Sequence, residues 1–253
     1  MSSTVLKIIA CVAMLLDHTG YMMQTYGVGS YDTSSLLRII GRMAFPIFAF
    51  LIAEGFKRTK NVVYYTLRLL LAGVISEIPF NLFSNKALEY KGSLNVMFTL
   101  AVGLVALIFA DMCIKSSKKE VRFLFVLPLF AACHFAEIYG MDYKDWGVIL
   151  IFLFYLVDTS SIQKRLMLLP VTALFASRKI ISDVIYGKGF SAWDKTQLFA
   201  LLAVIPLMLY SGKKGSGKKS KNYKRYLFYL FYPAHLLLLY LIFSNYQKIV
   251  SLF

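Results

Sequence analysis

The chain has 253 residues, of which 58% are hydrophobic and 16% are charged. A soluble domain holds about 45–50% apolar and about 25% charged residues, so this composition indicates a membrane protein with several spans. The net charge of +15 does not indicate nucleic-acid binding, because the basic residues gather in short loops between apolar segments, as membrane topology selection produces. The three cysteines lie in or at the ends of apolar runs, and we expect neither a disulfide framework nor a metal site from them.

Apolar segments follow one another along almost the whole chain, and most are long enough to cross a hydrocarbon core of about 30 Å as a helix. The first contains Asp17 and His18, lacks a cleavage pattern after it, and is expected to remain as a span. We predict an all-α fold, a polytopic helical bundle of about nine transmembrane helices that forms a single membrane domain over 1–253. The predicted spans are 5–24, 36–56, 62–83, 94–114, 121–137, 143–158, 164–181, 196–211 and 226–247.

Lysine and arginine are distributed unevenly over the predicted loops. The loops that contain KRTK (57–60), KSSKKE (115–120) and the run 212–225 alternate with loops that are poor in basic residues. This bias predicts a cytoplasmic N-terminus and an outer C-terminus. The Gly-Ser content of 212–225 predicts a flexible basic cytoplasmic loop, with contact to anionic lipid or to a cofactor phosphate as its alternative role.

The second segment carries Arg38, Arg42 and Glu54 with Pro46 between them. A charge near the bilayer centre costs about 2.5–3.5 kcal/mol on insertion scales, so such residues call for a specific role. Arg38 and Arg42 are four residues apart and share a helical face, and Pro46 cannot donate to the carbonyl of Arg42. We therefore expect a kink beneath two arginines that line a polar cavity. The alternative is that the arginines only cap the outer end of the span by snorkelling.

Polar residues at a similar predicted depth recur on other spans, and a shared polar pocket explains them together. Pairing that only fixes helix register is the alternative. Asp17 points about 100° away from His18 on the same helix and is expected to pair with Arg38 or Arg42. His134 and His235 also stand within spans, where a histidine is often a satisfied interior residue. The pocket residues are Asp17, His18, Arg38, Arg42, Glu77, Asn81 and Asn95.

Lys7 and His18 project from one face of the first predicted helix, because eleven residues turn a helix by about 1100°. They are separated by about 16 Å along its axis, which is comparable to an extended pantetheine arm. Lys7 would then meet a CoA phosphate while His18 meets the thioester.

Five stretches resemble the TraX family, whose namesake acetylates the N-terminus of conjugative pilin. DYKDWGV (142–148) is similar to the family's DYG-type segment with two inserted residues, and the spacing of Lys7 and His18 is similar to the basic–x10–His signature of the wider membrane acyltransferase superfamily. The five stretches are LKIIACVAMLLDHTG (6–20), LRIIGRMAFPIFAFLIAEGF (37–56), RLLLAGVISEIPFNL (68–82), LNVMFTLAVG (94–103) and YLFYLFYPAHLLLLYL (226–241).

The resemblance implies an integral-membrane acetyltransferase that uses acetyl-CoA. With the predicted topology, we expect a protein of a bacterial plasma membrane that moves an acetyl group from cytoplasmic acetyl-CoA to an amine or hydroxyl of a peptide or small molecule at the outer face. With that activity, His18 is expected to act as base or to form an acetyl-His intermediate. A transporter or flippase that uses the same charges as a path is the rival class, and a scaffold without chemistry is a third. The catalytic candidates are His18, Asp17 and Arg42; the candidates for holding acetyl-CoA are Lys7, Arg38, Arg58 and Arg68; the substrate-binding candidates are Glu77, Asn81, Asn95, Asp142 and His235.

Overall fold

The computed structural model describes the whole chain except residues 90–91, 188–191, 213–222 and 251–253. Within the described residues the fold is helical, and its only bridge pairing joins Leu94 and Met141. The predicted all-α class is therefore confirmed. Most of the predicted loop 212–225 lies outside the described residues.

Six helical segments of the described chain are long and apolar enough to cross a membrane, so this is a multi-pass membrane protein. The other three predicted spans form shorter or less apolar helices: α8 (Lys144–Leu156), α10 (Leu168–Ile185) and the stretch Lys195–Met208. All nine predicted segments are thus helical where the structure describes them. The six long segments are Ser3–Tyr26, Tyr31–Arg58, Val62–Asn85, Val96–Ile114, Lys119–Ile138 and Tyr226–Tyr246.

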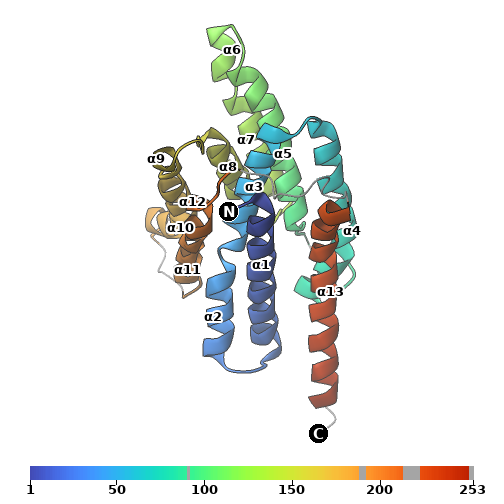
Figure 1. Cartoon of the computed structure of the whole chain (residues 1–253). Coiled ribbons are helices and arrows are strands. Elements are labelled where there is room, and N and C mark those ends of the chain that lie inside the picture. The colour runs from blue at the N-terminus through green and yellow to red at the C-terminus, as the bar shows by residue number, and fades with distance from the viewer. Residues whose placement is uncertain (90–91, 188–191, 213–222, 251–253) are drawn as a thin grey trace. The chain divides into compact units, whose positions relative to one another are not determined.

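The chain divides into two compact units that interleave along the sequence. Figure 1 colours the chain by residue number, from blue at the N-terminus to red at the C-terminus. The first unit comprises Met1–Phe48, Ile78–Leu88 and Thr159–Phe253, and the second comprises Ala49–Glu77 and Glu89–Asp158. The single domain predicted over 1–253 remains a prediction.

In the first unit, α1 (Ser3–Tyr26) packs against both α2 (Tyr31–Gly41) and α13 (Tyr223–Val250). Ser2 caps the start of α1 by accepting from the amide of Val5, and Gly27 ends it with a left-handed φ of 66°. The smaller helices of this unit are α9 (Ile162–Arg165), α10, α11 (Ala192–Gln197), η1 (Leu198–Ala203) and α12 (Val204–Met208).

A two-residue turn interrupts the helix of the second segment, where a kink is predicted. Helix α2 ends at Gly41, Arg42 and Met43 form a turn, and α3 (Ala44–Arg58) begins directly after it. Pro46 lies in the first turn of α3, where its missing N–H leaves no helix bond unmade.

Glycines allow the backbones of α1 and α2 to approach closely. A Cβ atom built on Gly41 would lie 2.2 Å from the Cβ and 2.6 Å from the Cα of Asp17. A Cβ on Gly20 would lie 2.6 Å from the carbonyl oxygen of Ser34. Small residues are common where membrane helices cross, because they let the backbones approach and make packing contacts.

Substituting Gly41 by alanine is expected to separate α1 from α2, because its new methyl group would meet the backbone of Asp17 rather than a movable side-chain end. Overpacking of this kind costs about 1–3 kcal/mol. Gly73→Ala is the matched control, since the atoms nearest to its Cβ belong to the side-chain ring of Phe98, at 3.2 Å, and alanine favours helix. The unfolding temperatures of both variants in detergent check this. Equal temperatures for the two variants would contradict the close crossing.

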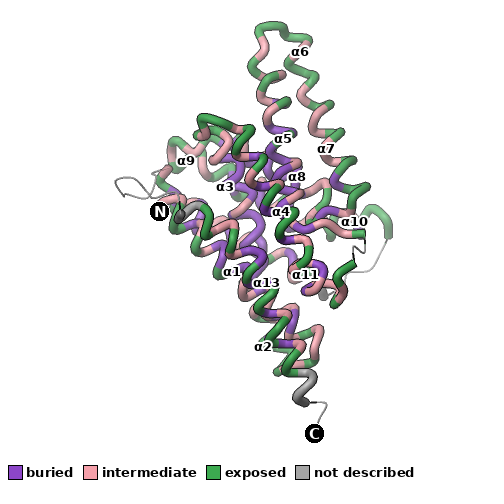
Figure 2. The backbone as a smooth tube through the Cα atoms, turned by 90° about the vertical axis from the view of Figure 1, so that its right-hand side faces the viewer, coloured by how far each residue is buried: buried purple, intermediate pink, exposed green. Residues whose placement is uncertain are grey.

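The second unit is built from α5 (Val96–Ile114), α7 (Val126–Ile138) and α8, with the short α6 (Lys119–Phe123), the end of α3 and most of α4 (Val62–Asn85). Within the most apolar stretch of Tyr31–Arg58, 67% of the residues are buried, against 6% for Lys119–Ile138. Figure 2 shows this difference along α3 and α7. The exposed apolar surface of α7 is therefore available to lipid.

Candidate functional site

Two histidines from opposite ends of the chain meet in the first unit. Nδ1 of His18 on α1 lies 2.7 Å from Nε2 of His235 on α13. The two rings are inclined by only 2° and their centroids are 5.0 Å apart. Because the nitrogens are so close while the centroids are not, the rings share a plane and bond edge to edge rather than face to face.

The backbone fixes the direction of this hydrogen bond. The other ring nitrogen of His235, Nδ1, lies 2.7 Å from the carbonyl oxygen of Phe231. A carbonyl only accepts, so Nδ1 of His235 carries the proton, and in the neutral ring its Nε2 is the acceptor. His18 must then donate from Nδ1, which leaves the lone pair on its Nε2. A basic nitrogen is thus oriented by a chain of two donors, as in catalytic triads.

Aromatic rings surround the histidine pair. Phe83, at the end of α4, has its ring centroid 5.0 Å from that of His18, and Tyr232 lies 5.7 Å from His235. His235 is 4% exposed. Restricted water access strengthens the polar interactions that do form there.

A cluster of charged side chains begins next to the histidine pair in the sequence, because Asp17 directly precedes His18 on α1. The guanidinium of Arg42 contacts Oδ1 of Asp17, and Nε of Arg38 lies 3.9 Å from the same oxygen. All three residues are buried. The predicted pairing of Asp17 with the arginines is confirmed, and the three side chains together carry a charge of +1. The guanidinium of Arg38 also lies 5.2 Å from the ring centroid of Tyr21.

Lys7 and His18 face the same neighbour. The ammonium of Lys7 lies 5.3 Å from the ring centroid of Phe228 on α13, and His18 bonds to His235 seven residues further along that helix. Seven residues complete almost two turns, so one face of α13 meets both side chains. This agrees with the predicted alignment of Lys7 and His18 on one face of α1.

Comparisons with known proteins identify the family of this chain. The sequence model of a family described as "TraX protein" matches residues 2–243. The chain belongs to the TraX family. A curated relative of this TraX-family chain is "Probable fimbrial assembly protein FimC, serogroup H1" from Dichelobacter nodosus, which is 34% identical over 150 residues. The match spans 56% of this chain and 56% of the relative, so it covers little more than half of either protein. No solved structure matches.

The candidate residues of this TraX-family chain fall into two groups. The structure places seven in the first unit and five in the second. The first group is Lys7, Asp17, His18, Arg38, Arg42, Asn81 and His235; the second is Arg58, Arg68, Glu77, Asn95 and Asp142.

Asn95 has structural partners in the second unit. Its amide donates to Glu77 at 2.5 Å and to the carbonyl of Gly73 at 2.8 Å, while its oxygen caps α5 by accepting from Met97. The backbone carbonyl of Asp142 accepts from the hydroxyl of Thr99. The contacts of Asn95 attach the start of α5 to α4, and the contact of Thr99 attaches α5 to the residues just before α8. Both have the register-fixing role. The substrate-binding roles of Glu77, Asn95 and Asp142 remain predictions.

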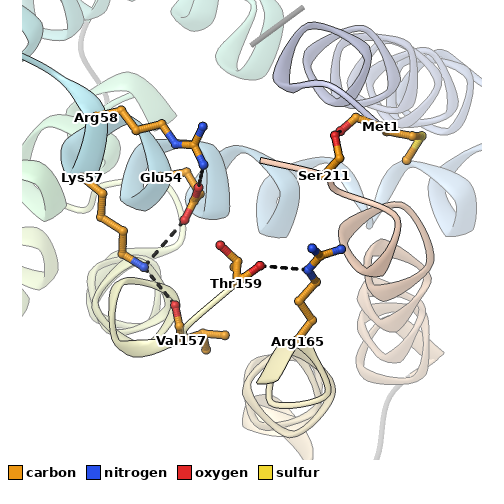
Figure 3. A network of polar contacts seen from close by, with 8 residues as sticks. All are labelled: Met1, Glu54, Lys57, Arg58, Val157, Thr159, Arg165 and Ser211. Carbon is orange, nitrogen blue, oxygen red and sulfur yellow. Dashed lines mark hydrogen bonds and ion pairs between the residues drawn. The ribbon is translucent and has the colours of Figure 1, made fainter. Parts of the chain in front are cut away.

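Glu54 holds two basic residues at the end of α3 (Figure 3). It bonds Arg58 at 2.8 Å and lies 3.6 Å from Lys57, which also donates to the carbonyl of Val157 at 2.9 Å. The guanidinium of Arg68 lies 6.0 Å from the ring centroid of Tyr65. A role for Arg58 and Arg68 in holding acetyl-CoA remains a prediction. Glu54 is thus the centre of a local ion-pair network.

The remaining candidates have local contacts. Asn81 is buried on α4, and its side-chain oxygen accepts from Asn85 one turn later at 3.3 Å. His134 is exposed on α7, with its ring 6.2 Å from that of Phe130. Sequence reasoning missed the aromatic wall provided by Phe83. The apolar stretch from 62 to 83 ends on that residue, but nothing local indicates that it packs on α1.

Proposed function

We propose that this TraX-family protein is an integral-membrane acetyltransferase that moves an acetyl group from acetyl-CoA to an acceptor amine or hydroxyl. The observation that carries the proposal is the directed pair of His18 and His235, which leaves a lone pair on Nε2 of His18. Membership of the TraX family supports the reaction class. The name of the Dichelobacter nodosus relative supports a pilin subunit as acceptor.

The proposed reaction needs one base. Nε2 of His18 takes the proton from the acceptor as its nitrogen or oxygen attacks the thioester carbonyl. The carbon–sulfur bond then breaks, and the departing thiolate takes the proton back from His18. His235 accepts from Nδ1 of His18 throughout, so the imidazolium formed in between is stabilised by an oriented acceptor. The same lone pair would instead attack the thioester if an acetyl-His intermediate forms.

The arginines next to the pair supply the charge that acyl transfer requires. The cluster of Asp17, Arg38 and Arg42 carries a net charge of +1 close to His18 in the sequence. An oxyanion develops on the thioester carbonyl, and a preorganised guanidinium is a strong donor to such a group. Asp17 limits the repulsion between the two arginines and holds them in place.

Transfer of label from acetyl-CoA to an acceptor, measured in membranes, tests the function. Membranes that contain the protein would be incubated with radiolabelled acetyl-CoA, and labelled products identified by mass spectrometry. The proposal expects label on an amine or hydroxyl that depends on His18. Acetyl-CoA that stays intact while a solute or lipid crosses the bilayer would overturn it in favour of transport.

We further propose that the protein lies in a bacterial plasma membrane with a cytoplasmic N-terminus and an outer C-terminus. The basic loops support this orientation. Reporter fusions after Lys60 and Lys119 are expected to give cytoplasmic signals, as is a fusion after Lys221, which lies outside the described residues. An outer signal at any of these positions would overturn this assignment.

Lys7 is proposed to bind a CoA phosphate from its place eleven residues before His18. Lys7→Ala is expected to weaken CoA affinity, by about 1.5–3 kcal/mol if one charge-assisted contact is lost, and to leave the rate at saturation nearly unchanged. Affinity measured by calorimetry and kcat measured with saturating donor separate the two effects. Unchanged CoA affinity would remove Lys7 from the donor site.

A further inference from the structure

A cavity of about 530 Å³ opens within the second unit, where α3, α5 and α8 end and α4 begins. This volume lies in the range of about 300–1,000 Å³ that is typical of small-molecule sites. The cavity is lined by Phe56, Lys57, Thr59, Lys60, Val62, Asp111, Ile114, Lys115, Tyr155 and Leu156. None of these residues belongs to the candidate site in the first unit.

The charge of the lining is positive. Three lysines, Lys57, Lys60 and Lys115, face one acidic residue, Asp111. Both oxygens of that carboxylate are engaged, because Tyr155 donates to Oδ1 and Lys115 bonds to Oδ2 at 2.9 Å. The acidic residue is therefore neutralised within the wall, and it neutralises Lys115 in turn. The remaining positive charge comes from Lys60 and from Lys57, which shares Glu54 with Arg58. Helix C-termini attract lysines on their own, but they do not explain a cavity between them.

One of the cations is held in position. The ammonium of Lys57 donates to the carbonyl of Val157 at 2.9 Å and lies 3.6 Å from Glu54 (Figure 3). It also lies 5.6 Å from the ring centroid of Tyr155. Fixing a lysine by backbone and ring contacts removes much of the entropy that a ligand would otherwise have to overcome. Lys60, in contrast, is exposed in the loop between α3 and α4.

The rest of the wall is apolar and aromatic. Phe56 and Tyr155 pack edge to face with centroids 5.7 Å apart, and Val62, Ile114 and Leu156 complete the lining. A site with cations on one part and apolar surface on another matches an amphipathic anion. Basic pockets between membrane helices are known to bind phosphate head groups in this way.

We propose that this cavity binds a phosphate ester whose phosphate meets the lysines and whose apolar part meets the aromatic wall. Two sources have that chemistry: a soluble nucleotide and the head group of an anionic phospholipid. The proposal does not depend on acetyl transfer, because it uses neither His18 nor any other residue of the first unit.

The test uses the full chain purified in detergent. ADP binding is measured by calorimetry, and retention of phosphatidylglycerol against phosphatidylcholine is measured by native mass spectrometry. The probe variant is the pair Lys60→Gln and Lys115→Gln. Its matched control is the pair Lys118→Gln and Lys119→Gln, which removes the same charge from neighbouring positions outside the cavity. The substitution Lys60→Glu alone gives a second probe that leaves the Asp111–Lys115 pair intact.

The proposal expects saturable binding of one probe and a loss of about tenfold or more in affinity in both probe variants, since charge-assisted contacts are removed. The control pair and His18→Ala should bind as the unmodified chain does. Binding of ADP alone identifies a soluble nucleotide as the source, and selective retention of phosphatidylglycerol identifies a lipid. Absence of saturable binding by both, or an equal loss in the control pair, overturns the site.

Discussion

Replacing Asp17 by alanine is expected to destabilise the protein by about 3–5 kcal/mol, because removing one partner of a buried ion pair leaves uncompensated charge. Arg38 and Arg42 are only 5% and 7% exposed, and both point at the same carboxylate oxygen of Asp17. Without it, two guanidinium groups on consecutive turns repel each other inside the first unit. The unfolding temperature of the purified protein in detergent measures the loss.

Two further variants isolate the cause. Glu137→Ala also breaks an ion pair, with Lys144, but both of those side chains are more than half exposed, so the change should be within about 1 kcal/mol. Combining Asp17→Ala with Arg42→Leu removes a stranded charge together with its partner and should recover part of the lost stability. If Asp17→Ala unfolds at the same temperature as Glu137→Ala, the cluster does not stabilise the fold.

The features that could be predicted from sequence are those that depend on local pattern. The lengths of the apolar segments predicted the helices. The four-residue spacing of Arg38 and Arg42 predicted that they share one helical face, and Asp17 was expected to pair with them. Proline chemistry also indicated a distortion near Pro46, although the outcome is a break at Arg42 and Met43 rather than a bend. These results follow from helix geometry, which depends on a few neighbouring residues at a time.

The features that could not be predicted depend on contacts between distant segments. His18 and His235 are separated by 217 positions, and the sequence around each histidine does not indicate that the two are in contact. The cavity lysines read as ordinary basic loop residues, because their shared wall forms only when α3, α5 and α8 end near one another. Gly41 also could not be predicted, because its role is to let the backbone of Asp17 on α1 pack closely against α2.

The largest functional effect is expected from His18→Ala. Removing the base is expected to lower the rate of acetyl transfer by about 10²–10⁴-fold, because general-base catalysis contributes that much. CoA affinity should be retained, since the proposed phosphate contact comes from Lys7. The initial rate of label transfer from radiolabelled acetyl-CoA, measured together with CoA binding, separates the two.

His235 is expected to act as a positioning residue, and a conservative substitution tests that role. In His235→Ala, Nδ1 of His18 loses its acceptor and the tautomer that leaves Nε2 unprotonated is no longer enforced. In His235→Gln, a side-chain oxygen can accept from Nδ1, so activity should fall less than in the alanine variant. A residue that only fills space would not distinguish the two substitutions in this way.

His134→Ala provides the control for both changes, because this third histidine is exposed on α7 outside the pair. Its transfer rate should equal that of the unmodified chain. If His235→Ala abolishes turnover while His18→Ala does not, the base and its positioning residue are reversed, because the lone pair that accepts the proton must then belong to His235. If both variants transfer acetyl at the full rate, the pair fixes helix packing between α1 and α13 and the reaction centre lies elsewhere.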